Sequence, residues 1–246
     1  MTKIERIKRE GLNHSKNRDD LLKVMNKILI TFSLLITFSF SNGIEIPNIM
    51  DMQENKEKKL YKDLISFLDG SPSGEYKMYL AIIYLNGIDI PDSKGNTINE
   101  DIKLSIEYFK KSIGLGYFKS STILGSLFLF DDRFKKIKDF DKKAKFYLTQ
   151  GLDNGIDESI MALSSYYFYY EKNATQALEL LHLGSRSNLS TAQLALATTY
   201  GYGSKELKIK QDLFLGNKYL KLACENKKQT EYVKKFCNSN YIIKGE

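Results

Sequence analysis

The sequence is poor in the residues that most often carry enzyme chemistry: its 246 residues include two histidines, two cysteines and no tryptophan. His14 precedes a segment that we expect to be removed, which leaves His182. His182 stands between two leucines on a predicted helix, which is typical of a partly buried or surface histidine. A zinc enzyme needs several histidine, cysteine or carboxylate ligands, and the glycines form no phosphate-binding motif. We therefore expect no catalytic residue, no metal and no cofactor.

The positive charge of the chain, +7 at pH 7, lies mostly near its two ends. Eight basic and four acidic residues precede Ile28, in the segment that we expect to be lost. Nucleic-acid binding loses most of its support with that segment. Residues 205–246 hold ten lysines against five acidic residues, which favours an acidic partner or an envelope surface. The other lysine pairs are typical of solvated faces.

The N-terminal part has the layout of a secretory signal. Ile28 to Phe40 is a run of 13 apolar and hydroxyl side chains that follows Lys27. At about 1.5 Å per residue it reaches roughly 20 Å, short of a bilayer core of about 30 Å. We expect cleavage after Ser41 or Gly43 and export to the periplasm or the medium. The alternative is an uncleaved membrane anchor, and translation can start at Met1 or Met25.

The chain from residue 105 onward repeats itself, three times in full and once in part. A small residue opens each copy: Ser105, Ala144, Ala177 and Gly216. In the complete copies it stands 11 positions before Gly116, Gly155 or Asn188, and a leucine follows 8 positions later: Leu124, Leu163 and Leu196. Because these spacings hold without a gap, they indicate a structural repeat.

Each repeat contains two kinds of predicted helix. Helix A carries the marker leucine (Leu80, Leu124, Leu163, Leu196), a small residue after it (Ala81, Gly125, Ser164, Ala197) and an aromatic four positions on (Tyr84, Phe128, Tyr167, Tyr200). Leucine and ring share one helix face, so we expect one buried stripe. Helix B carries small residues seven apart: Ser105 and Ser112, Ala144 and Gly151, Ala177 and Gly184, Gly216 and Ala223. This spacing suits a helix packed tightly between two neighbours.

Turn and cap signals separate the helices. Thr97-x-x-Glu100 predicts a capping box that opens the helix B of the first unit, and Asn173-x-x-Gln176 offers a weaker version in the third. The connection from A to B varies in length, as expected for loops that project from one edge of a stack. Residues 57–68 have helical spacing and predict an N-terminal capping helix.

Helix B followed by helix A resembles the Sel1-like repeat, a relative of the tetratricopeptide repeat. The residues that carry the resemblance are Lys143-Ala144 with Phe146-Tyr147, Ser112, Gly116, Ser120, Leu124-Gly125 and Phe128. The family's Tyr-x-x-Gly turn stands at Tyr84–Gly87 and Tyr200–Gly203, whereas the third unit lacks the Gly-x-Gly turn and has Asn188 at its glycine position. The resemblance implies an all-α solenoid of antiparallel helix pairs wound into a right-handed superhelix. It divides the chain into a signal (1–43), a linker with a capping helix (44–73), four repeats (74–226) and a C-terminal capping helix (227–246).

The resemblance also implies a function and leaves one alternative. Sel1-like repeats present a surface to proteins or peptides, so we expect an interaction scaffold that meets a membrane only through an uncleaved signal. Exported cysteine-rich relatives have been labelled β-lactamases, so a cell-wall or β-lactam hydrolase is the alternative. A serine β-lactamase needs Ser-x-x-Lys, and no serine here has a lysine at that distance.

We expect the partner surface on helix A, opposite the leucine–aromatic stripe. Together with Phe168, from an aromatic run that ends at Tyr170, the candidates are Ile82, Thr122, Ser126, Met161, Ser165 and Thr198. The alternative is that neighbouring units cover these positions, because a helix that is apolar all round is usually buried.

The resemblance extends to one cysteine. Cys224 occupies the helix B position that is cysteine in the cysteine-rich relatives, but their second cysteine falls where this chain has Tyr232. We expect a disulfide between Cys224 and Cys237 in an oxidising compartment. Two buried free thiols are the alternative.

Overall fold

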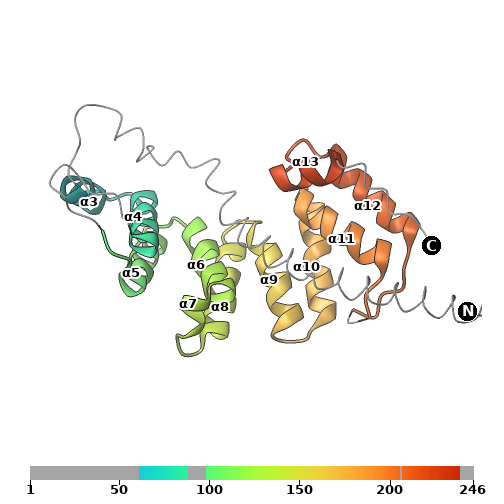
Figure 1. Cartoon of the computed structure of the whole chain (residues 1–246), viewed down its shortest axis with the longest axis horizontal. Coiled ribbons are helices and arrows are strands. Elements are labelled where there is room, and N and C mark those ends of the chain that lie inside the picture. The colour runs from blue at the N-terminus through green and yellow to red at the C-terminus, as the bar shows by residue number, and fades with distance from the viewer. Residues whose placement is uncertain (1–60, 88–97, 206, 239–246) are drawn as a thin grey trace, which may run out of the picture.

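The computed structural model describes residues 61–87, 98–205 and 207–238 (Figure 1), and everything said below about structure concerns these residues. They form eleven helices and, apart from an isolated bridge between Ser204 and Ile209, no strand. The helices are α3 (Tyr61–Gly70), α4 (Gly74–Asn86), α5 (Ile102–Gly114), α6 (Lys119–Phe130), α7 (Asp132–Lys135), α8 (Phe140–Asp153), α9 (Ser159–Tyr169), α10 (Ala174–Arg186), α11 (Ser190–Tyr202), α12 (Leu213–Glu225) and α13 (Glu231–Asn238). The predicted signal and most of the linker lie outside the described residues.

The helices form four pairs that follow one another along the chain. The A helices are α4, α6, α9 and α11, and each packs most extensively on the B helix that follows it, respectively α5, α8, α10 and α12. Figure 1 shows the pairs side by side, with α3 at one end of the row, α12 at the other, and α13 along the upper side next to α11 and α12. The prediction of an all-α solenoid of helix pairs is therefore confirmed.

The first small residue of each B helix lies against the A helix of its own pair. Ser105 donates a hydrogen bond to the carbonyl of Ala81 at 2.7 Å, and Ser164 donates one to the carbonyl of Ala177 at 2.9 Å. A Cβ atom added at Gly216 would lie 2.7 Å from the Cα atom of Gly201. Helices A and B thus touch nearly backbone to backbone, and the repeated small residues make that approach possible.

The second small residue of each of the first three B helices lies against the A helix of the next pair, and that of the last, Ala223, packs in one cluster with Val233 of α13. The hydroxyls of Ser112 and Ser120 are 2.7 Å apart. A Cβ atom added at Gly151 would lie 2.5 Å from the Ser159 hydroxyl, and one at Gly184 would lie 2.8 Å from the Cβ of Ala192. Each B helix is therefore held between two neighbours, as its spacing predicted.

The turn from helix B to the next helix A explains the glycine position of the repeat. Gly116, Gly155 and Asn188 have backbone φ angles of 82°, 79° and 60°, all in the left-handed region. Glycine adopts this conformation without strain, and asparagine tolerates it better than most other residues. Asn188 therefore keeps the turn that glycine makes in the two units before it.

Three A-to-B loops end in a side-chain cap. The Asp101 carboxylate accepts a hydrogen bond from the Leu104 amide at 2.9 Å, and Asp212 and Asn173 cap α12 and α10 in the same way. Thr97 of the predicted capping box lies outside the described residues, and the prediction that this box opens α5 is wrong, because α5 begins at Ile102 and Asp101 caps it. The Asn173 cap is confirmed.

The first and last described helices, α3 and α13, are held in place by different contacts. At the N-terminal end the buried ammonium of Lys77, on α4, binds the carboxylate of Asp69 at 3.1 Å and holds α3 in place. At the C-terminal end the fully buried Val233 of α13 packs in one cluster with Ala223 of α12. Cys224 and Cys237 form a disulfide across the same junction, with their Cα atoms 5.6 Å apart, so the predicted bridge is present.

Candidate interaction surface

Four of the seven residues expected to contact a partner are buried by neighbouring elements. Thr122, Ser126, Met161 and Ser165 expose between 3% and 7% of their surface. The Thr122 hydroxyl is hydrogen-bonded to the Ser159 hydroxyl of α9 at 2.6 Å, and Met161 packs in one cluster with Leu181 of α10 and Leu196 of α11. The prediction that these four side chains face a partner is therefore wrong, and the alternative, coverage by adjacent units, describes them.

The A helices reach the surface mainly at their C-terminal turns. Phe168 is half-exposed there, whereas Ile82 and Thr198 are half-exposed one turn earlier and remain candidates. We call the C-terminal turns of α4, α6, α9 and α11, with the loops that follow them, the loop edge. In Figure 1 the loops after α6, α9 and α11 lie along the lower side of the row.

In the stripe that we expected to be buried, the four leucines are buried but three of the four aromatic rings reach the surface. The four marker leucines expose at most 2% of their surface, and Phe128 exposes 1%. Tyr84, Tyr167 and Tyr200 are instead half-exposed, because they stand in or next to the last helical turn. The loop edge thus carries a half-exposed tyrosine in three of its four units.

In three units the ring of helix A stacks on a ring of the following helix B. Tyr84 stacks on Tyr108 with centroids 5.5 Å apart, Phe128 on Tyr147 at 6.0 Å, and Tyr200 on Tyr219 at 5.8 Å. The third unit has Leu180 at the helix B position. Both columns were visible in the sequence, but their pairing required the structure.

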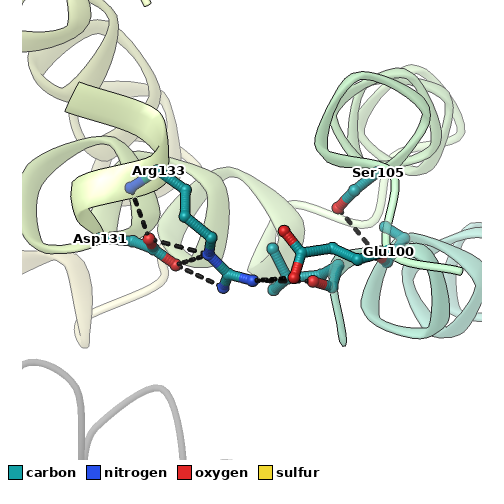
Figure 2. A network of polar contacts seen from close by, with 6 residues as sticks. Glu100, Ser105, Asp131 and Arg133 are labelled. Atoms are coloured by element: carbon teal, nitrogen blue, oxygen red, sulfur yellow. Dashed lines mark hydrogen bonds and ion pairs between the residues drawn. The ribbon is translucent and has the colours of Figure 1, made fainter. Parts of the chain in front are cut away.

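Arg133 joins the first two units at this edge (Figure 2). Its guanidinium lies 2.6 Å from the Asp131 carboxylate and 3.0 Å from that of Glu100, and it donates to the Leu85 carbonyl at 3.0 Å. Burial alone raises the pKa of Asp131, but the hydrogen bonds and charge of Arg133 outweigh it and hold this pKa below its ordinary value. The sequence gives no sign of this contact, because Glu100 and Arg133 are far apart in the chain.

Lys145 makes the corresponding junction between the second and third units. Its ammonium lies 2.6 Å from the Glu171 carboxylate and 4.9 Å from the centroid of the Tyr167 ring. The hydrogen bond to Glu171 raises the pKa of Lys145. A cation over a tyrosine face is an attractive arrangement, and here it leaves the other parts of the half-exposed ring accessible.

His182 makes the junction between the third and fourth units. Its Nε2 atom lies 3.0 Å from the Tyr200 hydroxyl, and its Nδ1 atom lies 3.1 Å from the Tyr219 hydroxyl. Burial, and then the charge of Arg186, lower the pKa of His182. A neutral imidazole offers one donor and one acceptor, so one tyrosine accepts and the other donates. His182 is therefore a half-buried histidine with both nitrogens bonded, as its position between leucines indicated.

Tyrosines are among the titratable groups of the loop edge. Burial raises the pKa of Tyr84 and Tyr200, and raises that of Tyr108 to about 12, so the phenols stay neutral near pH 7. They offer ring faces and hydrogen bonds. In the described part of the chain no three histidine, cysteine or acidic side chains come together as metal ligands. No helix among the described residues is both long and apolar enough to cross a membrane.

Comparison with known proteins identifies the fold. No family model and no curated protein matches the sequence. Among solved structures, the chain is similar to c5321, a protective antigen of uropathogenic Escherichia coli strains with an SLR (Sel1-like repeat) fold: 15% identity, a TM-score of 0.51, and coverage of 68% of this chain and 33% of that one. A Sel1 repeat protein from Oxalobacter formigenes gives 16% identity, a TM-score of 0.49, and coverage of 71% and 72%.

The chain therefore has the Sel1-like repeat fold, and the resemblance read from its sequence is confirmed at the level of the fold. It spans about a third of the length of the Escherichia coli antigen.

Proposed function

We propose that this protein is an exported scaffold that binds a protein or peptide in the bacterial cell envelope through its loop edge. The observation that carries the proposal is the half-exposed tyrosine at equivalent positions of the first, third and fourth units, where the second unit has the buried Phe128. Tyrosine presents a large rigid ring and a hydroxyl at small entropic cost, which is why it is enriched in interfaces. A series of such rings suits an extended chain segment that crosses several units.

The three unit junctions support the same proposal. Arg133, Lys145 and His182 each fix a residue of the loop edge, so the rings are held in place before a partner arrives. A surface that is ordered in advance loses less conformational freedom on binding. The Sel1-like fold is compatible with this role, because solenoids present long surfaces built from equivalent positions.

Site-specific photo-crosslinking in the native host tests the proposal. A photoreactive phenylalanine analogue placed at Phe168, on the loop edge, should give a discrete adduct with one protein or peptide. The matched control is Leu115, which is 49% exposed but stands in a turn from helix B to helix A, at the other end of the helices. Adducts of equal yield at both positions, or none at Phe168, would contradict the proposal.

Export is tested separately by determining the N-terminal residue of the protein recovered from the envelope fraction. The apolar segment before Ser41 is the motivating observation. The proposal expects a chain that begins after Ser41 or Gly43. If the protein is found in the cytoplasm with an intact N-terminus, export is refuted, but the binding proposal is not affected.

A further inference from the structure

The net positive charge of the described chain comes from its last unit and cap, although residues 119–153, with eight basic and five acidic side chains, are also locally basic. The described side chains between residues 65 and 204 comprise fourteen basic and fourteen acidic residues. Residues 205 and 207–238 comprise nine lysines and three acidic residues. All nine lysines are exposed, and two of them form ion pairs with described carboxylates: Lys221 with Glu225, and Lys234 with Glu231.

The fourth unit also exposes a large apolar side chain to solvent. Phe214, in the first turn of α12, is 83% exposed, and Leu222 is 42% exposed. The corresponding position of the other B helices is polar and exposed: Lys103, Lys142 and Thr175. The fourth unit alone places an aromatic ring where the repeat otherwise presents a polar group to water.

Phenylalanine and lysines share one face of α12. Lys218, Lys221 and Leu222 follow Phe214 by four, seven and eight positions, so all four project from a single outward stripe. The opposite face, with Gly216, is buried against α11. Just before the helix, Lys208 and Lys210 add two exposed charges at the end where the ring stands. We name this stripe with its two loop lysines the basic stripe.

We propose that the basic stripe docks on an anionic phospholipid surface. Exposed phenylalanine and leucine among lysines are the composition of helices that lie at a membrane interface. The lysines are spread over a loop, a helix about 20 Å long and the terminal cap. A fluid bilayer can bring a phosphate to each of them and receive the ring between its acyl chains. A folded acidic partner would need fixed carboxylates and a pocket over the same wide area.

This contact is distinct from the loop-edge proposal and does not depend on it. From the sequence we expected membrane contact through the apolar segment Ile28–Phe40, and we left an acidic partner or an envelope surface open for the basic end at 205–246. The basic stripe assigns that end to a lipid surface. Each lysine near an anionic surface contributes about 1 kcal/mol, which corresponds to about fivefold in affinity.

The absence of tryptophan allows a position-specific test in the full chain. Phe214→Trp introduces a single fluorophore on the basic stripe, so the N-terminal segment cannot produce its signal. With vesicles of phosphatidylcholine and phosphatidylglycerol we expect a blue shift and quenching by brominated acyl chains. Phosphatidylcholine alone should give neither. The matched control is Phe146→Trp, because Phe146 is 62% exposed on α8, a helix that exposes no other large apolar side chain, and should stay in water. Residues 119–153 carry eight basic and five acidic side chains, so this control also tests whether positive charge alone is sufficient.

Charge variants complete the test. Lys210→Gln with Lys218→Gln should raise the vesicle concentration at half-maximal shift about 20-fold. Salt near 1 M, where the Debye length is about 3 Å, should also weaken the response. An unchanged emission with anionic vesicles would overturn the proposal, and so would equal shifts at Phe214 and Phe146. A shift produced by polyglutamate and not by vesicles would overturn it in favour of an acidic polypeptide.

Discussion

Gly125 offers the sharpest test of the packing that holds the repeats together. It lies in the middle of α6, where alanine is normally preferred over glycine by about 1 kcal/mol. A Cβ atom added there would lie 2.7 Å from the Cγ of Leu148 and 2.9 Å from its amide nitrogen. The amide nitrogen belongs to the backbone of α8, so this contact cannot be relieved by a change of rotamer.

The expected result of Gly125→Ala is a net loss of stability. Overpacking a close contact costs about 1–3 kcal/mol, and subtracting the gain of about 1 kcal/mol in helix propensity leaves a loss of up to about 2 kcal/mol. In a chain of this size each kcal/mol lowers the melting temperature by about 2–4 °C. Thermal and urea unfolding followed by circular dichroism measure both quantities. Replacing Ala144, the first small residue of α8, by a large residue should act in the same direction.

The control is Gly114→Ala, because Gly114 is also helical but a Cβ atom there would meet nothing within 4 Å. We expect a gain of about 0.4–1 kcal/mol. Lys136→Ala, at an exposed site, should stay within about 0.5 kcal/mol. If both glycine variants gain stability equally, the close approach of α6 and α8 is refuted.

Three further predictions follow from single contacts. Gly155→Ala should destabilise by about 1 kcal/mol because its φ of 79° is strained for alanine, although no atom obstructs the Cβ; a gain equal to that of Gly114→Ala would contradict the turn. Removing the disulfide with Cys224→Ser and Cys237→Ser should cost about 3 kcal/mol in the chain-entropy model, seen as faster hydrogen exchange in α12 and α13; unchanged exchange there would disprove its role. The pKa of His182 is lower in the folded protein than in the unfolded chain, so the unfolded chain binds the proton first and stability should fall as the pH drops below 6.5. His182→Gln should remove that part of the pH dependence. If the dependence of stability on pH is the same in the variant, His182 is not responsible for it.

The repeat could be predicted from the sequence because its rules are local. Small residues at fixed spacing mark close helix contacts, and the structure places both columns of helix B against neighbouring helices. The glycine position was recognisable even at Asn188, since few residues tolerate the left-handed turn. The loop before α5 was mispredicted, because Thr97 and Glu100 imitate a capping box and only the position where α5 begins, at Ile102, makes Asp101 the cap.

The surface was harder to predict than the fold. Helical geometry places Ser126 opposite the buried stripe, but it cannot show that the packing of the units leaves this residue only 3% exposed. The loop edge depends on contacts between units, such as Arg133 with Glu100 and Lys145 with Glu171, which are distant in sequence. Such contacts leave no periodic signal, so they become visible only when the units are stacked.

Crosslinking along the whole loop edge tests the central claim most directly. Probes at Asn86, Phe168 and Thr199 stand in the C-terminal turns of α4, α9 and α11, and all three positions are exposed or half-exposed. The account predicts an adduct with the same partner from each probe in the native host, and none from Leu115. Adducts with unrelated proteins at the three positions, or none at any of them, would contradict a scaffold that holds one partner along this edge.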